Sequence, residues 1–174
     1  MREAATRRWT GALGTVLLLL SSGCFASKRP LGPPKGGAID ERLIATWTCR
    51  PPDKEPKGQE ETTMDVAAFD ETQYIVEWRE KNEDGSLEKP EYYRVYSTRV
   101  GAETLLNVKE LGTATGGGSW SFLRYRIEKD GLLHAWIVDD DAVGAKDDAG
   151  LAVIRKRVAD EKLYRDFMTC RHKE

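Results

Sequence analysis

Three cysteines, Cys24, Cys49 and Cys170, carry the most versatile chemistry in this chain of 174 residues. A thiolate can be acylated, can form a disulfide or can bind a metal ion. A structural zinc site needs four cysteine or histidine ligands at set spacings, and the chain adds only His134 and His172. Since no Cys-x-x-Cys pair occurs either, we expect acylation or disulfide formation rather than a metal centre.

The first 23 residues are typical of a signal peptide. Arg2, Arg7 and Arg8 form a basic head, and an apolar stretch follows from Trp9 to Leu20. This stretch is shorter than the roughly 20 residues that a membrane-spanning helix needs. We therefore predict a targeting segment over residues 1–23 rather than a transmembrane helix.

The next residues, Leu20-Ser21-Ser22-Gly23-Cys24, resemble the lipobox of bacterial lipoproteins. In that family a signal peptidase cuts before the cysteine, whose sulfur carries a diacylglycerol, and acyl chains such as palmitate are added at its amino group. The resemblance implies that Cys24 is lipidated and anchors the protein to a membrane. The alternative is an ordinary signal peptide followed by a free cysteine.

Residues 24–38 are rich in proline and glycine, with lysine and arginine between them. This composition predicts an unpacked tether between the lipid and a folded domain at 39–174. In lipoproteins of two-membrane bacteria, an aspartate after the lipidated cysteine retains the protein at the inner membrane. The resemblance implies an outer-membrane location here, because Phe25 occupies that position.

Composition excludes two classes of protein. A net charge of −2 and a pI of 5.8 give no basic surface for nucleic acid. Hydrophobic residues make up 40 % of the chain and five are tryptophans, which is enough for a packed core and argues against disorder.

Cys49 and Cys170 lie near the beginning and the end of the predicted domain. Outside the cytoplasm, two thiols that can meet are oxidised. We therefore predict a structural disulfide between them. The alternative is a reactive thiol pair, for which His172 is the one histidine close in sequence.

Runs of alternating apolar and polar residues predict seven strands between Leu43 and Val138. Asp130-Gly131 predicts a tight hairpin, and the mostly short connections require antiparallel neighbours. A meander of this length removes its exposed edges by closing on itself. The tail Phe167–Arg171 is either part of a second helical turn or an eighth strand that pairs with the first.

The fold class is therefore mainly β: an antiparallel up-and-down meander closing into a barrel of about eight strands, with one or two short helices near the C-terminus. Leu43 to Trp47 resembles the opening strand of lipocalin-like barrels, which carry Gly-x-Trp there. The resemblance implies that Trp47 packs across a closed end of the barrel, against an arginine such as Arg171, and that a ligand can occupy the interior.

Two assignments of the strand Trp120–Glu128 remain open, since either face can point into the barrel. On one assignment the arginines of this strand, beside aromatic residues, hold an acidic head group above an apolar pocket. On the other, Leu123, Tyr125 and Ile127 form the core, which the desolvation cost of two arginines favours. The candidate ligand-binding residues on the first assignment are Trp78, Trp120, Phe122, Arg124 and Arg126.

Other polar groups do not combine into a catalytic motif. Asp139, Asp140 and Asp141 lack the spacing of a calcium-binding EF-hand and suit a helix cap. The glycine-rich run at 112–118 has no following Lys-Ser/Thr pair and is predicted to be a connection rather than a phosphate loop. We predict no enzyme activity, no metal and no cofactor.

The sequence favours a non-enzymatic cell-envelope lipoprotein with a structural or protein-interaction role. A lipocalin-like carrier of a small apolar or amphipathic ligand is the first alternative, and a surface enzyme inhibitor is the second. The expected partners are the membrane, through the lipid on Cys24, and either an envelope protein or an apolar ligand.

Overall fold

The computed structural model describes residues 23–34, 39–52, 61–81, 86–112 and 118–173. The predicted signal peptide up to residue 22 lies outside these residues, as do parts of three predicted connections at 53–60, 82–85 and 113–117. In chain order the elements are η1 (Glu41–Leu43), β1 (Thr46–Arg50), β2 (Thr62–Ala68), β3 (Gln73–Arg79), β4 (Glu91–Val100), β5 (Glu103–Leu111), β6 (Trp120–Ile127), β7 (Leu133–Val138), α1 (Asp140–Val143), α2 (Asp147–Arg157), η2 (Glu161–Leu163) and β8 (Tyr164–His172).

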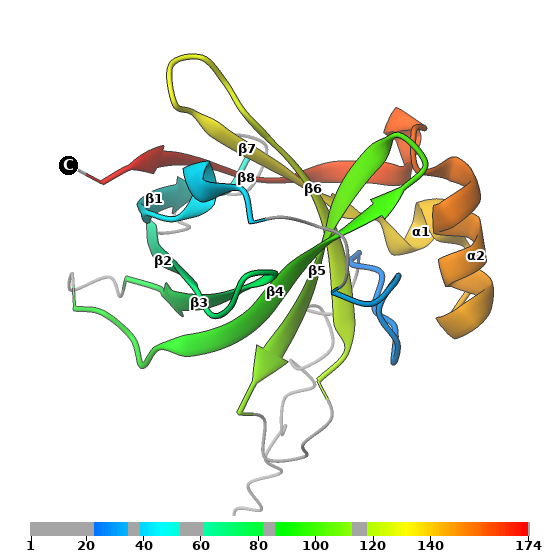
Figure 1. Cartoon of the computed structure of the whole chain (residues 1–174), viewed down its shortest axis with the longest axis horizontal. Helices are drawn as coiled ribbons and strands as arrows, with labels where there is room; N and C mark the ends of the chain where they lie inside the picture. The colour runs from blue at the N-terminus through cyan, green and yellow to red at the C-terminus, as the bar shows by residue number, and fades with distance from the viewer. Residues whose placement is uncertain (1–22, 35–38, 53–60, 82–85, 113–117, 174) are drawn as a thin grey trace, which may run out of the picture.

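The eight strands form one closed antiparallel barrel (Figure 1). Each strand pairs with its neighbours along the chain, and β8 returns to pair with β1. The predicted meander, its closure and the eighth strand are thus confirmed. Closure leaves no free edge, which an open sheet of this size would expose.

A disulfide lies across the seam where the barrel closes. Cys49 of β1 stands directly opposite Cys170 of β8 in the antiparallel ladder, and the two sulfurs are bonded. Both side chains are buried. The bond joins positions 121 residues apart and ties the first strand of the barrel to the last.

The two ends of the barrel differ in their connections. Short turns join β2 to β3, β4 to β5 and β6 to β7 at one end, which η1 also covers. We call this the closed end. The longer connections, including the one that carries α1, α2 and η2, lie at the other end, which we call the open end.

The short helix η1 replaces the first residues of the strand predicted from Leu43. The Asp40 carboxylate accepts a hydrogen bond from the Arg42 backbone N–H and so caps a helical turn. Leu43 is buried at the end of that turn, and β1 begins only at Thr46.

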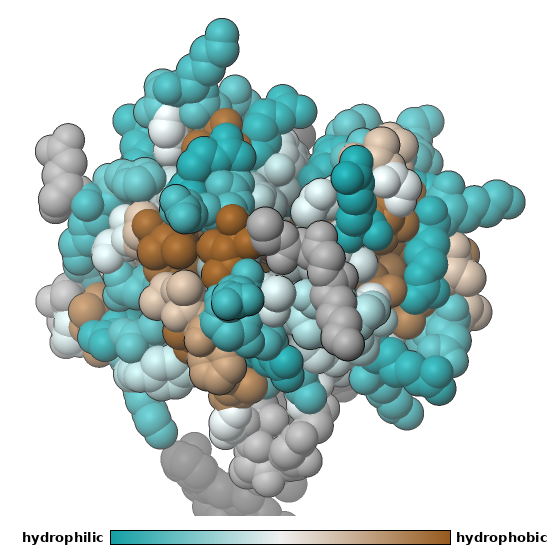
Figure 2. Space-filling model, viewed as in Figure 1, coloured by the Kyte–Doolittle hydropathy of each residue, from teal (hydrophilic) through white to brown (hydrophobic). Residues whose placement is uncertain are grey.

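The hydrophobic residues gather in two cores. One lines the inside of the barrel, and the other lies outside the wall formed by β5, β6 and β7, beneath α2. On the face shown in Figure 2 the surface is mainly hydrophilic; the largest hydrophobic area lies over the barrel, and a smaller one lies on the side of the helices.

Residues 23–34, which we call the N-terminal strap, form part of the outer core. The strap lies between the barrel and α2 (Figure 1). Phe25 is fully buried and its ring stacks on Phe122, while Leu31 is also buried. The prediction of an unpacked tether is therefore wrong for this part of 24–38, because two apolar side chains among the prolines and glycines are enough to dock it.

Polar groups fix the strap along its length. Ser27 and Trp120 exchange two backbone hydrogen bonds of 2.9 and 2.7 Å. The Leu31 backbone N–H donates to Asn107 Oδ1 at 2.9 Å, and Arg155 of α2 donates to the Leu31 carbonyl at 2.8 Å. Asn107 is fully buried, so this bond satisfies a polar group that would otherwise destabilise the fold.

Candidate functional site

The barrel encloses a cavity of about 360 Å³. Alternation along each strand turns every second side chain inward, and the cavity lining includes one valine from each of the strands β2 to β5 and one alanine from β7. These short side chains leave the centre of an eight-stranded barrel open, where longer ones would fill it. The inward residues include Val66, Val76, Val95, Val108, Leu123 and Ala135.

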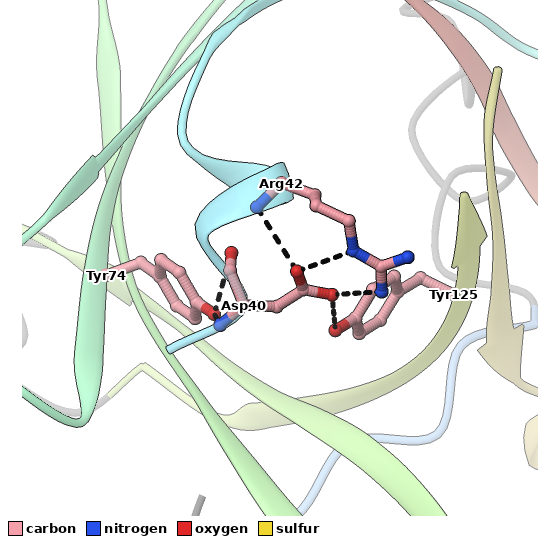
Figure 3. Close-up of polar contacts among 4 residues, drawn as sticks. All are labelled: Asp40, Arg42, Tyr74 and Tyr125. Atoms are coloured by element: carbon pink, nitrogen blue, oxygen red, sulfur yellow. Dashed lines mark hydrogen bonds and ion pairs between the residues drawn. The ribbon is translucent and has the colours of Figure 1, made fainter. Parts of the chain in front are cut away.

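The short helix η1 plugs the closed end of the cavity, and the Asp40 carboxylate holds it there (Figure 3). Asp40 accepts hydrogen bonds from Arg42 Nε and Nη2 at 2.9 and 2.7 Å and from the Tyr125 hydroxyl at 3.0 Å. Its own backbone N–H donates to the Tyr74 hydroxyl at 2.6 Å. Asp40 therefore ties η1 to β3 and to β6.

These contacts control the protonation of the plug. The hydrogen bond from the Arg42 side chain lowers the pKa of Asp40, burial opposes that effect, and the Tyr125 hydroxyl adds to it. Burial raises the pKa of Tyr125, and the Asp40 charge raises it further. Near neutral pH the carboxylate is thus ionised and the phenol is its hydrogen-bond donor.

Trp47 packs against the same plug. Its side chain is fully buried, and its Nε1–H donates to the Leu43 carbonyl at 2.9 Å. The ring meets His172 of β8 edge-on, with the two centroids 4.1 Å apart. The expectation that Arg171 packs on Trp47 is wrong, because Arg171 is exposed and lies opposite Thr48, one residue out of phase.

The open end of the cavity is lined by aromatic and acidic residues. Trp78 and Tyr93 line it together with Glu80 and Glu91. The Tyr93 hydroxyl donates to Glu91 Oε2 at 2.5 Å. Burial raises the pKa of Tyr93, and the hydrogen bond to Glu91 raises it further. The phenol therefore stays protonated and orients the Glu91 carboxylate at this open end of the cavity, which we call the mouth.

Among the candidate ligand-binding residues, only Trp78 lines the cavity. On β6 the inward residues are Ser121, Leu123 and Tyr125. The assignment that placed the arginines inside is therefore wrong, and the one favoured by desolvation cost is confirmed. Trp120 and Phe122 face the outer core beneath the strap.

Arg124 and Arg126 lie on the outside of the barrel wall. Arg124 donates two hydrogen bonds to the Glu161 carboxylate, at 2.9 and 2.6 Å. Its guanidinium also lies 4.4 Å from the ring centroid of Tyr164 and 5.2 Å from that of Trp136. Arg126 is exposed, 5.8 Å from Trp136. These contacts account for both side chains without a ligand.

Sequence analysis missed the residues at the two ends of the cavity. Asp40 lies in a segment with no alternation, so no pattern placed it at the end of the barrel. Tyr93 and Glu91 belong to β4, where Tyr92 and Tyr93 compete for the inward position. Only the pairing of Tyr93 with Val76 in the β3–β4 ladder places Tyr93 on the cavity side.

Cys24 lies on the surface at the open end. It forms an isolated bridge with Asp139, the residue that follows the last residue of β7. Its thiol is free, and Arg165 Nη2 lies 2.9 Å from the sulfur. The side chain is exposed, so the sulfur can be reached from solvent.

Comparison with family models, with curated proteins and with solved structures finds no match for this chain. Within the described ranges, no group of three or more histidine, cysteine or acidic side chains is placed to hold a metal ion. None of the helices in the described part of the chain is long and apolar enough to cross a bilayer.

Proposed function

We propose that the barrel binds one small apolar or amphipathic ligand in a protein that a lipid on Cys24 anchors to the cell envelope. The cavity of about 360 Å³ carries the binding proposal. Its volume lies within the range of roughly 300 to 1,000 Å³ that is usual for small-molecule pockets.

The cavity also changes the order of the hypotheses. A barrel that served only as a scaffold or docking surface would gain stability from a filled core, because an unfilled space forfeits dispersion contacts. The structural or protein-interaction role that the sequence favours therefore becomes the second candidate. The inhibitor hypothesis loses support, since it needs an extended N-terminal segment and residues 23–34 are packed on the barrel.

The proposed anchoring rests on the signal-peptide pattern and on the position of Cys24. Its exposed sulfur leaves room for a diacylglycerol. Phe25 after the cysteine supports an outer-membrane location in an organism with two membranes. We propose a binding role without catalysis, metal or cofactor.

Binding is tested with N-phenyl-naphthylamine, a neutral probe that fluoresces in apolar surroundings. Ala135 lines the cavity and His134, its neighbour on β7, does not. We expect Ala135→Phe to abolish the fluorescence increase and His134→Phe, the matched outward substitution, to retain it. Equal probe binding by both variants would contradict a ligand site in the barrel.

Anchoring is tested by intact mass spectrometry of protein extracted from membranes. We expect cleavage before Cys24 and an added mass that corresponds to a diacylglyceryl group and an acyl chain. Cys24→Ser is expected to remove the added mass and release the protein from the membrane fraction. An unmodified Cys24 in membrane-extracted protein would overturn the proposal.

A further inference from the structure

We infer that the cavity selects ligands with a cationic head group, that is, amines or other positively charged amphiphiles rather than fatty acids. This inference rests on the proposed binding function. It follows from the kind of charge that surrounds the open end of an otherwise apolar cavity.

Three glutamates converge on the mouth. Glu80 follows the last residue of β3 and Glu91 begins β4 opposite Trp78, and both carboxylates line the cavity. Glu110 of β5 stands opposite Tyr93 in the β4–β5 ladder. All three raise the pKa of the Tyr93 hydroxyl through their negative charge, which places their field at this one point of the mouth.

Basic residues near the mouth glutamates do not line the cavity: Lys81 follows Glu80 and Lys89 stands two residues before Glu91, and neither is among the lining residues. Arg79 of β3 alternates with Trp78, so it lies on the outer face, and it forms an ion pair with Glu77. Lys109 of β5 lies over the Trp120 ring, 5.6 Å from its centroid. Among the described residues that line the cavity, none is lysine or arginine.

This arrangement discriminates by attraction and by repulsion. An apolar chain in the cavity leaves its head group at the mouth, beside Glu80 and Glu91. An ammonium group there can pair with either carboxylate, whereas a carboxylate head would place like charges side by side. The hydroxyl of Tyr93 does not relieve that repulsion, because it already donates to Glu91.

The test compares three ligands that share one chain and differ only in the head group: decylamine, decanol and decanoate. Binding to the full chain carrying Cys24→Ser, which cannot take a lipid, is measured by displacement of N-phenyl-naphthylamine below the micelle concentration of each ligand. Exposed ion pairs contribute up to about 1 kcal/mol, so we expect decylamine to bind about fivefold more tightly than decanol at low salt. Decanoate is expected to bind more weakly than decanol, and both differences are expected to shrink in high salt.

The variant Glu80→Gln/Glu91→Gln keeps the shape of the mouth and removes two charges. We expect it to bind decylamine and decanol within about twofold of each other. The matched control is Glu71→Gln/Glu128→Gln, which removes two exposed charges from turns at the closed end. This control is expected to keep the full preference for the amine, because it lies a barrel length away.

The outcomes separate this inference from the proposed function. Equal binding of all three ligands, or tighter binding of decanoate, would overturn the charge selection and leave the ligand site intact. A preference for decylamine that survives in Glu80→Gln/Glu91→Gln would also overturn it. Failure of all three ligands to displace the probe would instead contradict the proposed binding function.

Discussion

The packing of the strap against α2 predicts a specific energetic coupling between Phe25 and Gly150. The Phe25 ring is fully buried and lies so close to α2 that a Cβ added at Gly150 would overlap it. Replacing a buried phenylalanine by alanine costs about 3–5 kcal/mol. Gly→Ala inside a helix normally gains about 1 kcal/mol, but here we expect Gly150→Ala to destabilise the protein by about 1–3 kcal/mol through overpacking.

The double variant Phe25→Ala/Gly150→Ala measures the coupling energy between the two residues. Without the Phe25 ring, most of the overlap at position 150 disappears, although the Ala145 carbonyl oxygen would still lie 2.8 Å from the added Cβ. We therefore expect Phe25→Ala/Gly150→Ala to be less destabilised than the sum of the single variants by at least about 1 kcal/mol.

The free energies come from urea unfolding followed by tryptophan fluorescence, with Cys24→Ser in every variant. Ala152→Gly is the matched control, because Ala152 is an exposed residue of the same helix. It is expected to cost about 1 kcal/mol whether or not Phe25 is present. Additivity of Phe25→Ala and Gly150→Ala within about 0.5 kcal/mol would refute the docking of the strap on α2.

Three further predictions concern the seam, the plug and the outer wall. Replacing Cys49 and Cys170 by alanine removes a cross-link between positions 121 residues apart. We expect the free energy of unfolding, measured in urea, to fall by up to about 5 kcal/mol. An unchanged unfolding midpoint would contradict a disulfide in the native protein. The pKa of Asp40 is lowered in the folded protein, so the carboxylate stabilises the fold fully above about pH 4, its unfolded pKa, and this stabilisation is lost as the pH falls toward the folded pKa. Asp40→Asn is therefore expected to lose less stability than the unchanged protein between neutral pH and pH 3. An identical pH profile of the free energy of unfolding would refute this role. Arg124→Ala loses the pairing with Glu161 and is expected to cost about 1 kcal/mol with no change in probe binding, so a loss of affinity would place the ligand outside the barrel.

The overall architecture was predictable because strand alternation and short connections are local signals. The pairing of Cys49 with Cys170 also followed, because two thiols at the ends of one domain need only a closed barrel to meet. The inward face of β6 could be predicted from desolvation, because burying two arginines in an apolar core costs more free energy than leaving three apolar residues exposed.

The strap and the mouth could not be predicted in the same way. Packing of Phe25 depends on Phe122 and Gly150, which lie far away in the sequence and meet only in the folded chain. A Pro/Gly-rich composition reports the absence of regular structure, and a segment without regular structure can still be docked. The acidic mouth likewise combines Glu80, Glu91 and Glu110 from the ends of three strands. No single segment of the sequence shows that these strand ends meet.

The position of Cys24 has a consequence for where the mouth of the barrel would face. Phe25 is fully buried directly after Cys24, and Cys24 lies beside Asp139 at the open end. A lipid on this cysteine would leave no flexible tether between the bilayer and the folded domain. The open end of the barrel would then lie at the membrane surface. A ligand could then pass between bilayer and cavity without exposing its chain to water, a detour that costs about 0.8 kcal/mol for each methylene.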